Sequence, residues 1–151
     1  MHAVLTSLHA LAAAVWVGGM FFAYMVLRKA SAAQLAPPER LQLWNAVCSA
    51  FFRWVWLAIA LLLVTGTALI LLVYRGAWPG AWLAYMIGAG LVMMLLFGHV
   101  YFAPFRRLQE AVAAQDWPAA GAALGSIRAT IGINLILGIS VLLAGAGGRF
   151  W

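Results

Sequence analysis

The sequence predicts an all-α integral membrane protein, a bundle of four transmembrane helices in a single domain (residues 1–151). Hydrophobic residues make up 67% of the chain and charged residues 8%, whereas a water-soluble domain carries roughly 25% charged residues. Four apolar stretches are each long enough to cross a bilayer, which takes about 20 residues. They cover residues 3–27, 51–74, 81–102 and 129–147.

The spans are expected to be helices because a backbone in lipid must satisfy its own hydrogen bonds. Strands of a membrane barrel alternate in polarity over about ten residues, and runs such as LAIALLLVTGTALILLVY do not alternate. The opening segment lacks the positively charged start of a signal peptide. We therefore expect residues 3–27 to be a working span.

Most of the basic residues fall in or beside the first and third connections. They are Arg28, Lys29, Arg40, Arg53, Arg106, Arg107 and Arg128. The positive-inside rule then places both termini outside and these connections in the cytoplasm, in a multi-pass protein of the cell inner membrane. A basic stripe facing anionic headgroups of the lipid bilayer accounts for the net charge of +6, so nucleic acid is not an expected partner.

The cytoplasmic connections are expected to be amphipathic. From Leu41, apolar residues recur at helical spacing, which predicts that the second helix begins with a turn or two on the membrane surface. Pro104 marks a stop or a kink after the third span, and the following FRRLQEAVAAQ is expected to lie along the inner surface. Asp116 as a cap and Pro118 in the first turn predict the start of the last helix.

His9 lies within an otherwise apolar span, where an ionisable group is a functional candidate by default. The alternative is a structural histidine, bonded to a hydroxyl or carbonyl of another helix. Ala12 and Ala13 share the face of His9, and Trp16 follows one turn later. Two alanines beside a histidine, walled by an indole, predict a flat patch that suits a planar macrocycle. This pattern favours haem b, ligated by His9.

The second axial ligand is open. His9 and His99 should not share one iron, because they differ in depth by about 18 Å at 1.5 Å per residue. Met86 lies at about the depth of His9, and a methionine can ligate haem iron; core or lipid-facing packing is its alternative. His99 could ligate a second haem, assist proton exchange with a quinone, or form an interfacial hydrogen bond.

Other polar residues of the spans have ordinary alternatives. Arg53 could pair with a haem propionate or extend to lipid phosphate, and Asn134 is expected to join two helices. No carboxylate lies in a span, which argues against a proton-coupled transporter. Copper is the alternative to haem, because six Met and three His residues supply soft and borderline ligands, although they do not cluster in sequence.

The segment LHALAAAVWVGGMFF resembles the first helix of the CopD-like membrane proteins, which carry Leu-His, a small apolar stretch and Trp-x-Gly-Gly. FGHVYFAPFRRL and NLILG lie where that group has the end of its third helix and its fourth helix. More distantly, the chain is similar to the HemJ-type protoporphyrinogen oxidases. The resemblance implies His9 as a haem b ligand.

The chain departs from the HemJ-type proteins in the third span, where they carry a lysine. The corresponding stretch reads YMIGAG, and the only lysine is Lys29, so protoporphyrinogen oxidation is not carried over. We expect a membrane oxidoreductase that acts in electron transfer or a haem-linked oxidation, with a quinone or another redox partner, or else a copper resistance and transport protein. Whether it forms a homo-oligomer is left open.

Overall fold

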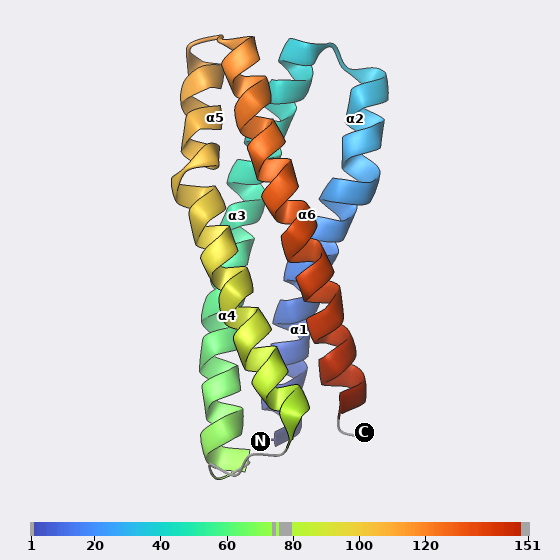
Figure 1. The fold of residues 1–151 in the computed structure, drawn as a ribbon, viewed down its shortest axis with the longest axis vertical. Helices are drawn as coiled ribbons and strands as arrows, with labels where there is room; N and C mark the ends of the chain where they lie inside the picture. Colours follow the sequence, from blue (N-terminus) through green and yellow to red (C-terminus); the bar gives the residue numbers. More distant parts are fainter. Residues whose placement is uncertain (1, 74, 76–79, 149–151) are drawn as a thin grey trace.

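The computed structural model describes residues 2–73, 75 and 80–148, and it consists of helices that run roughly parallel to one long axis (Figure 1). The first helical column contains α1 (His2–Phe21), the π-helical η1 (Phe22–Leu27) and α2 (Arg28–Gln34). The second contains α3 (Pro37–Ala68) and the π-helical η2 (Leu69–Val73). The third contains α4 (Ala81–Phe102) and α5 (Pro104–Ala113), and the fourth is α6 (Trp117–Gly147).

Four helical columns are long and apolar enough to cross a membrane, as the sequence predicts. They extend well beyond the apolar stretches themselves, over His2–Gln34, Pro37–Leu72, Ala81–Ala113 and Trp117–Gly147. The predicted end of the second span, at Tyr74, lies outside the described residues. Because the number of columns is even, α1 begins and α6 ends at the same end of the bundle (Figure 1).

The core of the bundle is aromatic on the side of α1, α3 and α4. Phe52 is 2% exposed and packs edge-on against Phe97 and Phe105, with ring centroids 5.3 and 4.9 Å apart. Trp16 meets Phe97 at 6.2 Å, also edge-on. Such pairs add directional contacts to the burial of large apolar surfaces. They therefore fix the positions of the first three helical columns relative to one another.

The segment α5 does not lie along the membrane surface, which corrects the expectation drawn from its amphipathic pattern. It continues the column of α4 and packs beside α6 (Figure 1). Its apolar stripe, including Phe105 and Leu108, is buried in the bundle, whereas Arg106 and Arg107 are exposed. An apolar stripe can be covered by neighbouring helices as well as by lipid, and here the lengthened α6 covers it.

The start of the second column is also part of the bundle and not a surface helix. Leu41, Trp44 and Cys48 are all buried, and α3 runs without interruption from Pro37. The free thiol of Cys48 is buried in this packing. The predicted cap of α6 is confirmed, since the Asp116 carboxylate accepts a hydrogen bond from the Ala119 N–H at 3.0 Å.

Candidate functional site

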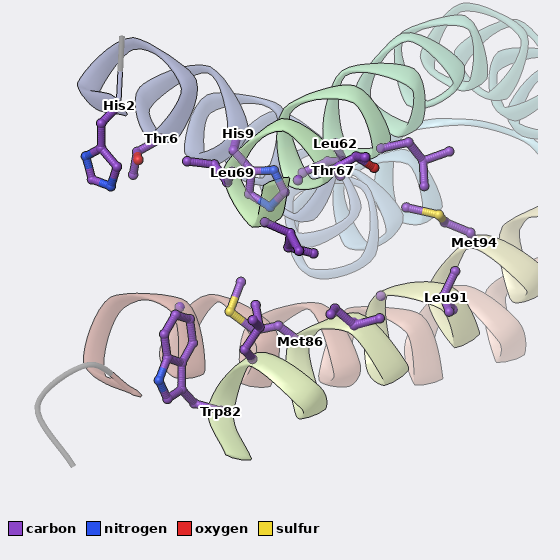
Figure 2. Close-up of a pocket in the computed structure, with 17 residues that line it drawn as sticks. His2, Thr6, His9, Leu62, Thr67, Leu69, Trp82, Met86, Leu91 and Met94 are labelled. Carbon is purple, nitrogen blue, oxygen red and sulfur yellow. The ribbon is translucent and has the colours of Figure 1, made fainter. Parts of the chain in front are cut away.

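A cavity of about 340 Å³ lies towards the end of the bundle where α1 begins, between α1, the end of α3 with η2, and α4. Most of its lining is aliphatic. Polar and sulfur-containing side chains interrupt that lining at a few places, and Figure 2 shows them facing one gap from opposite sides. They are His2, Thr6, His9, Thr67, Met86 and Met94.

The imidazole of His9 is held by a hydrogen bond to α3. Its Nδ1 lies 2.8 Å from the hydroxyl oxygen of Thr65, and the Thr65 hydroxyl donates to the carbonyl of Leu61 one turn earlier. Because the threonine proton is used in that bond, the hydroxyl oxygen accepts from His9, which places the imidazole proton on Nδ1. The Nε2 of His9 then carries no proton, and its lone pair is available to bind a metal.

The glycine next to Thr65 provides the space for the ring. A Cβ atom at Gly66 would lie 3.3 Å from Cε1 of His9 and 3.7 Å from Nδ1, so the imidazole rests directly against the backbone of α3. Two successive residues of α3 therefore position His9: Thr65 by a hydrogen bond and Gly66 by contact. Metal-binding histidines commonly donate their other ring N–H in this way, which fixes the orientation of the ring.

Met86 reaches the same gap from the opposite side. It lies on α4, and a Cβ atom at Gly145 of α6 would be 3.3 Å from its methyl carbon and 3.5 Å from its sulfur. Figure 2 shows the Met86 thioether projecting from α4 towards the side of the gap occupied by His9. Met94, two turns further along α4, also lines the cavity. His9 and Met86, which the sequence places at a similar depth, thus lie on two walls of one cavity.

The predicted macrocycle patch is not part of this cavity. Trp16 and Ala12 are 2% and 4% exposed and face the core, where Trp16 contacts Phe97. Ala13 is partly buried and is also absent from the cavity lining. The side chains of α1 that share the cavity with His9 are instead His2 and Thr6, towards the start of the helix.

His99 and Arg53 also lie apart from the cavity. His99 is exposed in the last turn of α4, and Arg53 is exposed on α3. Neither lines the hollow that contains His9. Asn134 is buried and donates to the carbonyl of Met93 at 3.4 Å, so it joins α6 to α4 as expected.

Sequence reasoning did not assign roles to Thr65, Gly66 or Met94. A hydroxyl within a span was visible, but its partner depends on how α1 and α3 are rotated against each other. Within residues 2–73, 75 and 80–148, no group of three or more His, Cys, Asp or Glu side chains is arranged to hold a metal ion. A metal bound in the cavity would therefore use His9 together with thioether or other ligands.

Comparison with known proteins gives one match. No curated protein and no solved structure matches the chain. A family model described as copper resistance protein D matches residues 45–147, which is more than half of the sequence. The match includes Thr65, Gly66 and Met86 but not His9. It confirms the resemblance to the CopD-like proteins, while the first-helix motif lies outside the matched residues. The chain belongs to the copper resistance protein D family of multi-pass membrane proteins.

Proposed function

We propose that this protein handles copper at the cell inner membrane, and that the cavity beside His9 receives Cu(I) as cargo. Imidazole nitrogen and thioether sulfur are ligands that suit Cu(I), and both project into this cavity. The observation that carries the proposal is the hydrogen bond between Nδ1 of His9 and Thr65, which leaves Nε2 available to a metal. Family membership supports the choice of metal.

The proposed copper ligands are the Nε2 of His9, whose ring is held in one orientation, and the thioether sulfur atoms of flexible methionine side chains. His9 is fixed by Thr65 and Gly66, whereas Met86 and Met94 have flexible side chains that can approach an ion from the opposite wall. His2 and Thr6 lie further along the same lining, towards the start of α1. Copper that enters at the start of α1 would thus contact His2 first and then bind His9 together with the thioethers.

The bundle is closed beyond this cavity. Trp16, Phe52 and Phe97 fill the space between α1, α3 and α4 with aromatic rings, and the hollow among them has a volume of only about 10 Å³. That volume holds about one water molecule at most. The bundle therefore receives and holds its cargo at one end, and onward transfer requires a partner or a change in packing.

Topology determines which side of the membrane the cavity faces. The basic residues gather at the opposite end, near α2, α5 and the start of α6. By the positive-inside rule that end is cytoplasmic. The cavity would then open to the outer face of the inner membrane and take copper from there.

Haem b is the second candidate, and the size of the cavity favours it. A single ion needs far less than about 340 Å³, whereas small-molecule sites typically measure about 300–1,000 Å³. His9 and Met86 would hold the haem iron. Haem would provide one-electron redox chemistry, as in an oxidoreductase that passes electrons to a quinone or another partner. Arg53, Ala12, Ala13 and Trp16 lie outside the cavity lining, so the residues fit haem only in part.

Two measurements on one preparation of purified protein distinguish copper binding from haem binding. After removal of bound metal, Cu(I) is titrated against a competing chromogenic chelator, and the visible spectrum is recorded before and after reduction. We expect one tight Cu(I) site per chain, weakened about 100-fold or more in His9→Ala, since removal of a ligand exceeds the 10–100-fold effect of an outer partner. His99→Ala is the matched control and should bind as wild type.

Two results would change this conclusion. Equal Cu(I) affinity in wild type and His9→Ala would contradict copper binding at this cavity. A Soret band that is lost in His9→Ala, with no tight Cu(I) site, would replace copper by haem b.

A further inference from the structure

A second site is indicated at the opposite, basic end of the bundle, around Arg128 of α6. This side chain is partly buried, and its guanidinium carbon lies 5.4 Å from the ring centroid of Trp44 on α3. Trp44 is itself buried and donates its indole N–H to the hydroxyl of Ser31 on α2 at 3.2 Å. Arg128 is therefore held against a fixed indole and does not extend freely into solvent.

Arg28 is brought to the same region by an aromatic contact. Its guanidinium carbon lies 5.0 Å from the ring centroid of Tyr24, and the Tyr24 ring packs on Gly132, where a Cβ atom would be only 3.3 Å away. Gly132 follows Arg128 by one helical turn, so both face the same side of α6. Arg28 and Arg128 thus belong to one cluster, formed where η1, α2, α3 and α6 meet.

The positive charge of this cluster has no balancing carboxylate among the described residues. Arg28 and Arg40 are positive side chains that lie near enough to repel Arg128. Of the three acids, Glu39 and Asp116 are helix caps, accepting from the N–H groups of Ala36 at 3.3 Å and Ala119 at 3.0 Å, and Glu110 is exposed on α5. Like charges gathered without a counter-ion favour the binding of an anion.

Arg128 also carries a donor that requires a partner. Its Nε is buried, and the described part of the chain offers it no acceptor. A buried N–H without a hydrogen bond costs free energy, the more so on a charged group. A phosphate oxygen would satisfy this donor, and guanidinium groups bind phosphate with charge-assisted, often paired hydrogen bonds.

We propose that Arg128 and Arg28 bind the phosphate of an anionic phospholipid at the basic end of the bundle. The neighbouring segments carry exposed apolar side chains along which acyl chains can lie: Met25 and Val26 on η1, each 48% exposed, and Ile133 on α6, 56% exposed. Basic pockets between transmembrane helices on the cytoplasmic side are known binding sites for anionic headgroups. The lipid would link the first column, which is splayed at α2, to α6 (Figure 1).

The test is lipid binding measured by native mass spectrometry on the full chain, purified in a neutral detergent. Phosphatidylglycerol and phosphatidylcholine of identical acyl chains are titrated separately, and inorganic phosphate forms a third arm. We expect one phosphatidylglycerol to bind at low concentration, with phosphatidylcholine and inorganic phosphate binding at least about tenfold more weakly. Arg128→Gln should weaken phosphatidylglycerol binding about tenfold or more, the loss expected for a hydrogen bond to a charged group.

Two further variants separate a built site from general surface charge. Arg107→Gln removes one positive charge from the exposed face of α5 at the same end of the bundle and should leave the affinity unchanged within about twofold. Arg128→Lys keeps the charge but removes the Nε–H and the planar group that stacks on Trp44, so it should bind more weakly than wild type. Thermal unfolding of each variant without lipid shows whether it is folded.

Three outcomes of these measurements would overturn the proposed lipid site. Equal losses in Arg107→Gln and Arg128→Gln would mean that only net charge attracts the lipid. Inorganic phosphate binding as tightly as phosphatidylglycerol, and lost in Arg128→Gln, would mean that the cluster takes a soluble phosphate group and not a lipid. Wild-type affinity in Arg128→Gln would remove the site altogether.

Discussion

The Nδ1 of His9 and the hydroxyl oxygen of Thr65 lie 2.8 Å apart across the contact between α1 and α3. This bond satisfies one nitrogen of the imidazole and, because Thr65 already donates to Leu61, it leaves the other nitrogen unprotonated. The structural histidine and the metal-binding histidine, which the sequence presents as alternatives, are therefore compatible. One ring nitrogen joins two helices, and the other is available to a ligand.

Thr65→Val tests whether this bond prepares the metal site. Valine has nearly the same shape but no acceptor for Nδ1, so the imidazole loses its preferred tautomer and orientation. We expect Cu(I) affinity to fall roughly 10–100-fold, as for other partners of metal-binding histidines, and this is measured by competition with a Cu(I) chelator. Thr67→Val is the control, since Thr67 lines the cavity without bonding to His9. Equal effects of the two substitutions would contradict the assigned role of Thr65.

Gly66→Ala tests the contact between His9 and the backbone of α3. The added Cβ would lie 3.3 Å from Cε1 of His9, and the ring, held at Nδ1, can yield only by lengthening its bond to Thr65. Gly145→Ala places a Cβ at the same 3.3 Å distance from the methyl carbon of Met86, which is the flexible end of a side chain. We expect Gly66→Ala to weaken Cu(I) binding more than Gly145→Ala in the same titration. The reverse order would mean that Met86 and not His9 is the rigid ligand.

Leu108→Ala tests the position of α5 within the bundle. Leu108 is 0% exposed, and removal of a buried leucine side chain typically costs about 2–5 kcal/mol. The expected result is a clear fall in the midpoint of thermal unfolding in detergent. The neighbouring Gln109 is exposed, so Gln109→Ala should leave the midpoint nearly unchanged. If both substitutions had the same small effect, α5 would lie on the membrane surface after all.

Gly138→Ala tests how closely α6 approaches α1 and α4. A Cβ at this position would be 2.7 Å from Cγ2 of Val17 and 3.1 Å from the methyl carbon of Met93, so the helices must move apart, at a cost of about 1–3 kcal/mol. A Cβ at Gly18 would meet nothing within 4 Å. Gly18→Ala should therefore preserve or raise the unfolding midpoint, while Gly138→Ala lowers it. A neutral Gly138→Ala would show that this contact is looser than described.

The four spans follow from composition and length alone, because lipid leaves the backbone few alternatives to a helix. The start of α6 also follows, from Asp116 and Pro118, but the placement of the amphipathic segments does not. Leu41, Trp44 and Leu108 lie in amphipathic segments, and the same apolar stripe suits a headgroup surface or a neighbouring helix. In this structure α6 extends beyond its apolar stretch and covers the stripe on α5, so the stripe faces a helix and not lipid headgroups. The local pattern of α5 does not show that α6 packs against it.

The candidate site could be predicted in part for a similar reason. The sequence predicts a similar depth for His9 and Met86, because depth depends only on the rise of a helix. The sequence predicts a binding surface on the face that His9 shares with Ala12, Ala13 and Trp16, whereas the rotation of α1 turns Trp16 towards Phe97 and the core. The roles of Thr65 and Gly66 depend on how α1 packs against α3, since 56 residues separate His9 from Thr65.

X-ray absorption at the copper edge of the Cu(I)-loaded protein tests the central claim most directly, because it identifies the atoms bound to the metal. Wild-type protein should show one imidazole nitrogen together with thioether sulfur. His9→Ala should lose the imidazole signal, and the same protein with His99→Ala should keep it. An unchanged imidazole signal in His9→Ala would contradict the assignment of His9 Nε2 as the ligand.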